Sequence, residues 1–181
     1  MRKMYMVLLA TILVSVSSFG QKGTTFIGAG GDLLLPTGFA ADYFKTGIGF
    51  SVKGLFGVGT AGQITITSGY VGFKTTIPAE IATTSGRLIP LLLGYRHNFN
   101  GFFVEPQVGY AVLGLTASDG VDYYTDSEGG FSWAAGIGYL FNNKVEVSAR
   151  YQASSKGGET DAFFGLRLGY NFSLNGPKSK R

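Results

Sequence analysis

Residues 87–114 read RLIPLLLGYRHNFNGFFVEPQVGYAVLG and form two alternating segments joined by a short turn. Within each segment small or polar residues separate a row of apolar ones: Ile89, Leu91, Leu93 and Tyr95, then Phe102, Val104, Val108, Tyr110 and Val112. A period of two residues, with one apolar face and one small or polar face, is typical of a β-hairpin. The stretch therefore predicts two antiparallel strands, and the rest of the chain repeats its pattern.

The same alternation recurs along the chain and predicts eight strands in all. Besides the two strands within 87–114, the predicted strands span residues 24–36, 46–58, 62–76, 130–141, 145–154 and 162–174. We expect a bulge near Ser68 to Tyr70, where the alternation shifts phase, and another at Pro106, which cannot donate to a strand ladder.

The predicted connections alternate in length. Short turns lie around 59–62, 98–101 and 142–144, and pairing Phe141 with Val145 keeps the faces matched across a three-residue loop. Longer connections span 37–45, 77–86, 115–129 and 155–161. Short turns at one end and long loops at the other are typical of an outer-membrane β-barrel.

The composition also favours a packed β protein. Charged residues make up only 14% of the chain and aromatic residues another 14%, which excludes a disordered polypeptide. The net charge of +4 arises from five cations near the two ends, and without them 10 basic residues (15 − 5) face 11 acidic ones. The body is thus nearly neutral, and we expect no nucleic-acid partner. With no Cys and one His, we also expect no metal site and no cofactor.

The chain ends indicate how the protein is organised. Residues 1–20 combine a basic start, a short apolar run and small residues at Ser18 and Gly20, which predicts a signal peptide. We expect a barrel over 21–174 and a basic periplasmic tail over 175–181.

The two faces of the strands predict which one meets lipid. Phe and Tyr recur at both ends of the apolar faces, as in the aromatic girdles of membrane barrels. The opposite face is rich in Gly, Ser and Ala and carries few charges, which suits a narrow lumen: Asp32, Lys53, Arg96, Glu105, Glu146, Arg150 and Arg167. The prediction is an all-β, eight-stranded, antiparallel, up-and-down transmembrane β-barrel. The alternative is a soluble barrel with its apolar face inward.

Two parts of the opening stretch have familiar counterparts. Residues 89–95 (IPLLLGY) and 101–110 (GFFVEPQVGY) resemble the outer membrane protein beta-barrel domain family, in particular PorT-like small barrels of Bacteroidota. The last strand ends with alternating Leu168, Tyr170 and Phe172, resembling the signal read by the outer-membrane assembly machinery. The family resemblance implies an outer-membrane barrel and no catalytic residue.

The lumenal charges allow two interpretations. We expect a neutralising network, since unpaired charge in so narrow a space is costly, with Arg96 lying diagonally from Glu105 across the hairpin. The alternative is a narrow channel or ion path.

The predicted loop between the fifth and sixth strands is the best candidate for contact with a surface or periplasmic protein. Its candidate contact residues are Asp119, Asp122, Tyr123, Tyr124, Asp126 and Glu128. Calcium binding by its carboxylates is an alternative. His97 leaves open a lipid-modifying enzyme, but we expect no enzyme. The remaining expected partner is outer-membrane lipid.

Overall fold

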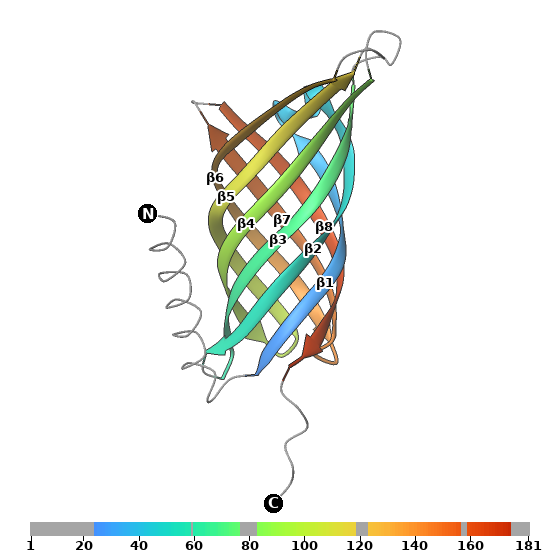
Figure 1. The fold of residues 1–181 in the computed structure, drawn as a ribbon. Coiled ribbons are helices and arrows are strands. Elements are labelled where there is room, and N and C mark those ends of the chain that lie inside the picture. The colour runs from blue at the N-terminus through green and yellow to red at the C-terminus, as the bar shows by residue number, and fades with distance from the viewer. Residues whose placement is uncertain (1–23, 59, 77–82, 119–122, 157–158, 175–181) are drawn as a thin grey trace, which may run out of the picture.

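The computed structural model describes residues 24–58, 60–76, 83–118, 123–156 and 159–174, and these form a closed barrel (Figure 1). The predicted signal peptide and basic tail lie outside the described residues. Each strand pairs antiparallel with its neighbours in sequence, and β1 closes the barrel against β8. The strands are β1 (Thr25–Thr37), β2 (Phe44–Val58), β3 (Gly62–Thr75), β4 (Thr83–Phe99), β5 (Phe102–Ser118), β6 (Tyr123–Phe141), β7 (Val145–Lys156) and β8 (Glu159–Ser173). The predicted eight-stranded up-and-down barrel is confirmed.

The apolar face of each strand points outward. Ile48 is 73% exposed and Leu168 is 63% exposed, whereas Arg96 and Glu146 are completely buried. A large outward apolar surface is stable in lipid, where a barrel leaves no backbone group unpaired. This arrangement contradicts the alternative of a soluble barrel with an apolar face inside.

Tight turns close the end of the barrel at which the chain enters β1 and leaves β8. Phe99 pairs with Phe102 around Asn100 and Gly101, whose φ angles of 52° and 100° suit a two-residue type I′ turn. Phe141 pairs with Val145, which confirms the predicted three-residue loop. In outer-membrane barrels the short turns face the periplasm, so the opposite end is the extracellular one.

Both predicted bulges are wrong. Between β2 and β3 the register is continuous from Gly47 opposite Phe73 to Val58 opposite Gly62, and the shift lies earlier, between Phe44 and Gly47. The change in pattern near Ser68 marks a change in what fills the lumen, because Val71 and Phe73 point inward as apolar residues.

At Pro106 the ladder between β4 and β5 keeps one register. It skips from Gly94 opposite Gln107 to His97 opposite Val104, without an inserted residue. The exposed Pro106 ring points outward, and its missing N–H interrupts the ladder but does not displace it. This register places Arg96 directly opposite Glu105, so the predicted diagonal arrangement is wrong.

Two of the predicted long connections are also much shorter. β5 pairs with β6 as far as Ser118 opposite Tyr123, and β7 pairs with β8 as far as Lys156 opposite Glu159. Strands that extend beyond the membrane are solvated on both faces, so they lose the alternation by which sequence identifies them. The connection after β1 contains a short helix, α2 (Ala40–Tyr43). No helix in the described part of the chain is long and apolar enough to cross a membrane.

Candidate functional site

The barrel brings all seven predicted lumenal charges into one layer, in which Arg150 is partly exposed and the other six are buried. They come from six of the eight strands: Asp32 on β1, Lys53 on β2, Arg96 on β4, Glu105 on β5, Glu146 and Arg150 on β7, and Arg167 on β8. Each has at least one oppositely charged partner within 4.0 Å. Sequence alternation identified these residues because inward-facing positions recur with the strand period.

Four of the charges form a compact quartet. Lys53 Nζ lies 2.9 Å from Glu105 Oε2 and 3.3 Å from Glu146 Oε1. Arg96 Nη2 lies 2.7 Å from Glu105 and 3.0 Å from Glu146. Each cation therefore bridges the same two carboxylates. Because the residues come from separate strands, the quartet ties β2, β4, β5 and β7 together across the lumen.

A second group joins the quartet from the seam between β1 and β8. Asp32 lies opposite Arg167 in the register, with 3.5 Å between Oδ2 and Nη1, and Arg150 Nη2 approaches Asp32 Oδ1 to 3.6 Å. Arg167 Nη1 and the Ser51 hydroxyl are also hydrogen-bonded, and Ser51 donates to Asp32. Arg167 Nε lies 3.5 Å from Glu146, which connects this group to the quartet.

Neutral side chains complete the polar layer. Thr65 donates to Glu105 Oε1 at 2.8 Å and Gln107 donates to the same oxygen at 2.9 Å. The guanidinium carbon of Arg96 lies 3.8 Å from the centre of the Phe103 ring. Buried carboxylates and guanidinium groups require such partners, because each loses its hydration on burial. The layer is thus built as a paired network that fills the lumen.

Above the polar layer, towards the extracellular end, the lumen is filled by apolar side chains. We call this second layer the plug; it consists of Leu34, Ala40, Phe44, Val71, Phe73, Leu88, Ala111 and Phe163. The Phe73 ring lies 5.5 Å from Phe44 and 5.3 Å from Phe163, measured between centroids. Leu88, Ala40 and Phe163 are completely buried. α2 thus supplies one plug residue.

The plug is not predicted by the sequence pattern. The alternation predicts a small or polar inward face along every strand, whereas Val71 and Phe73 interrupt that face in β3. The available signal is the change in pattern after Ser68, which predicts a bulge but in the structure marks the start of the plug in β3.

The predicted surface loop is largely part of strand β6. Tyr123 and Tyr124 pair with Ser118 and Ala117, and Asp126 pairs with Leu115. The side chains of Asp126 and Glu128 are exposed, whereas Asp119 and Asp122 lie outside the described residues. Among the described residues no group of three or more His, Asp or Glu side chains is arranged to hold a metal ion.

His97 does not join an acid and a serine. Its Nδ1 lies 3.3 Å from the Tyr95 hydroxyl, and its ring lies 4.5 Å from that of Phe99 between centroids. These neighbours belong to the outward aromatic face near the periplasmic turns, and aromatic residues of this kind gather at the membrane interface.

Comparison with known proteins agrees with this architecture. The sequence matches the outer membrane protein beta-barrel domain family over residues 6–172. No curated protein matches it. Among solved structures, the attachment invasion locus protein Ail of Yersinia pestis is similar with a TM-score of 0.64 and 15% identity, covering 84% of this chain and 100% of that one.

Two proteins of Pseudomonas aeruginosa are similar as well. The N-terminal β-barrel domain of OprF has a TM-score of 0.58 and 17% identity, covering 83% of this chain and 100% of that one. OprG has a TM-score of 0.55 and 10% identity, covering 83% and 96%. At such low identity these similarities show the fold alone, and the likeness to PorT-like barrels stays a prediction. The family match covers most of the chain, so this chain belongs to the outer membrane protein beta-barrel domain family and resides in the outer membrane.

Proposed function

We propose that this protein is a non-conducting, non-enzymatic barrel that acts through the surface it presents at the extracellular end. The observation that carries this proposal is that two layers of side chains, the polar layer and the plug, fill the lumen. An ion or solute on the barrel axis would have to displace the completely buried Phe163 and then separate Arg96 from Glu146, which are 3.0 Å apart. An eight-stranded barrel has an interior just wide enough for its own side chains. This supports a structural or partner-binding role over a channel.

The β5–β6 hairpin is the part best placed to meet a partner. Its ladder continues past Thr116 opposite Thr125 to Ser118 opposite Tyr123. Figure 1 shows this hairpin reaching beyond the β7–β8 hairpin at the same end of the barrel. A paired ribbon holds its backbone in one conformation and so loses little entropy on binding, which favours recognition of a protein at the cell surface.

Conductance in planar lipid bilayers tests the closed lumen. We expect no discrete current steps from the folded protein, with a general porin as the positive control in the same bilayer. Steps that persist after repurification, and that change when Phe163 is replaced by Ala, would establish the channel instead.

A shortened hairpin tests the surface role. Replacing residues 117–124 by Asn-Gly would join the paired Thr116 and Thr125 through a two-residue turn and leave both lumenal layers intact. We expect the variant to fold and to resist SDS when unheated. We also expect it not to reverse the envelope defect caused by deleting the protein from its host. Full restoration would show that the barrel alone suffices and that its role is structural.

A further inference from the structure

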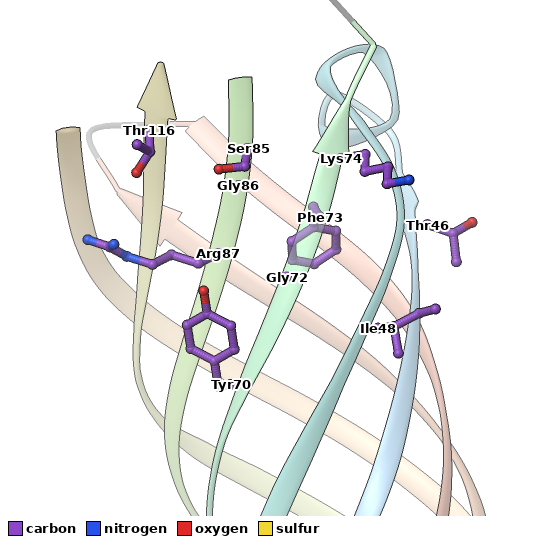
Figure 2. Close-up of a pocket in the computed structure, with 10 residues that line it drawn as sticks. All are labelled: Thr46, Ile48, Tyr70, Gly72, Phe73, Lys74, Ser85, Gly86, Arg87 and Thr116. Carbon is purple, nitrogen blue, oxygen red and sulfur yellow. The ribbon is translucent and has the colours of Figure 1, made fainter. Parts of the chain in front are cut away.

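The outer wall of the barrel carries a groove at its extracellular end. Figure 2 shows this groove over β2 to β5, and its volume is about 310 Å³. We call it the rim groove; it is lined by Ile48, Tyr70, Gly72, Lys74, Ser85 and Arg87, among others. Gly72 forms an open floor, because a Cβ built there would meet no heavy atom nearer than 3.9 Å.

The groove opens to the outside of the barrel. Phe73 and Leu88 are buried in the plug, so the residues next to them in each strand, Lys74 and Arg87, point away from the lumen. Figure 2 shows their side chains on either side of Ser85, with the Tyr70 hydroxyl directed up the groove. Neither cation takes part in the lumenal network. Both therefore face the surrounding membrane.

Along β2 to β5, the outward-facing charges at this end are positive, and the acidic Asp42 lies outside these strands on α2. Lys45, which is exposed, lies in the bulge of β2 opposite the end of β3, next in sequence to the groove residue Thr46. The sequences of β2 to β5 contain one acidic residue, Glu105, which is buried in the lumen. An outward wall with cations and no carboxylate is complementary to an anionic group.

Arg87 is also held in place. Its side chain crosses Gly114 on β5 and Nη2 donates to Ser127 Oγ on β6 at 3.0 Å. This hydrogen bond places Ser127 on the outer wall, so Asp126 and Glu128, its neighbours in β6, project from the other face of the strand. The two carboxylates are therefore turned away from the rim groove. A fixed guanidinium loses less entropy on binding an anion than a free one would.

The position of the groove along the barrel axis indicates which part of the membrane it contacts. Tyr70 marks the interface between the apolar wall and water, as tyrosines do in membrane barrels. Below it the wall is apolar, with Leu91 and Leu93 exposed on β4. A lipid of the outer leaflet that packs its chains on this wall would bring its headgroup to Lys74 and Arg87. We propose that the rim groove binds the phosphate-bearing headgroup of a membrane lipid, with these two cations as its ligands and Ser85 and Thr46 as hydroxyl donors.

Quenching of a single tryptophan by brominated lipid tests this site. The chain has one tryptophan, Trp133 on β6, so the variant Ile48→Trp with Trp133→Phe reports from the groove alone. It would be folded into phosphatidylcholine vesicles that contain dibrominated phosphatidic acid, or dibrominated phosphatidylcholine at the same mole fraction. We expect the brominated phosphatidic acid to quench more strongly. Its relative binding constant should fall about fivefold for each of Lys74→Gln and Arg87→Gln.

Matched controls keep the test falsifiable. Lys74→Arg and Arg87→Lys retain the charge and should retain the preference, and resistance of each unheated variant to SDS shows that it is folded. The chain with its native Trp133 should be quenched equally by both lipids, because Trp133 lies on β6 beside Tyr151 and away from the groove.

Three results would overturn the proposal. Equal quenching of the groove reporter by both lipids would show no site. An equal preference at Trp133 would show anionic lipid spread around the whole barrel. Displacement of the lipid by excess inorganic phosphate would show a site for free anions.

Discussion

Lys53 on β2 and Glu146 on β7 meet inside the barrel, with 3.3 Å between Nζ and Oε1, although 93 positions separate them in the chain. Neither strand is adjacent to the other in the sheet, so no ladder hydrogen bond brings them together. The contact exists because the sheet closes, and it forms only when the whole barrel is complete. The lumenal charges thus report on closure of the barrel.

Removing one carboxylate from this network should destabilise the barrel strongly. Glu146 forms ion pairs with Lys53, Arg96 and Arg167. Glu146→Gln therefore removes one ion pair from each of three buried cations. We expect the free energy of unfolding to fall by about 3 to 5 kcal/mol, measured by urea titration in lipid vesicles. Lys144→Gln on the exposed turn should change it by less than about 0.5 kcal/mol. Equal stability of both variants would refute the network's role.

The plug should be sensitive to loss of volume. Phe163 is completely buried, and Phe163→Ala removes a ring between Phe73 and the rest of the plug. We expect a loss of about 3 to 5 kcal/mol in the same titration, because the closed barrel cannot collapse onto the cavity. Phe164→Ala, one residue along β8 and outward-facing, should cost less, because lipid chains fill the space. If Phe164→Ala cost as much as Phe163→Ala, the plug would not be a packed core.

Close contact between β4 and β5 should make the barrel sensitive to any side chain at Gly109. A Cβ at Gly109 would collide with the carbonyl oxygen of Leu91 and lie 3.0 Å from Leu92 Cα, both in backbone that cannot move aside. We expect Gly109→Ala to destabilise the barrel by about 1 to 3 kcal/mol. Gly31→Ala is the control, since the nearest heavy atom to its Cβ would be 3.9 Å away. The temperature at which each variant loses its gel-mobility shift gives the comparison.

The turn between β4 and β5 should depend on backbone conformation. Asn100 has φ of 52°, in the left-handed region that Asn tolerates and Ala does not. Asn100→Ala should lower the free energy of unfolding by about 1 kcal/mol, whereas Asn100→Gly should be close to neutral. Calorimetry in detergent micelles would measure both. A loss with Gly as large as that with Ala would point to the Asn side chain instead of the φ angle.

The sequence alone determined the barrel, the outward direction of its apolar face and the residues of its polar layer. Period-two alternation identifies strands and their faces, and Asn-containing turns set registers such as Phe141 opposite Val145, because both are local properties of the backbone. The same alternation predicts that Lys53 and Glu146 lie on the inner face, where the structure brings them into contact.

Only the tertiary structure decided how the inward residues combine. Which charges meet depends on the stagger between neighbouring strands and on closure of the barrel. Stagger changes the height of a residue along the barrel axis, but a residue on the inner face stays there. The plug and the rim groove also depend on the register between strands, because each gathers side chains from several strands at the extracellular end of the barrel. Lys74 and Arg87, for example, line one groove only because β3 and β4 pair at that height.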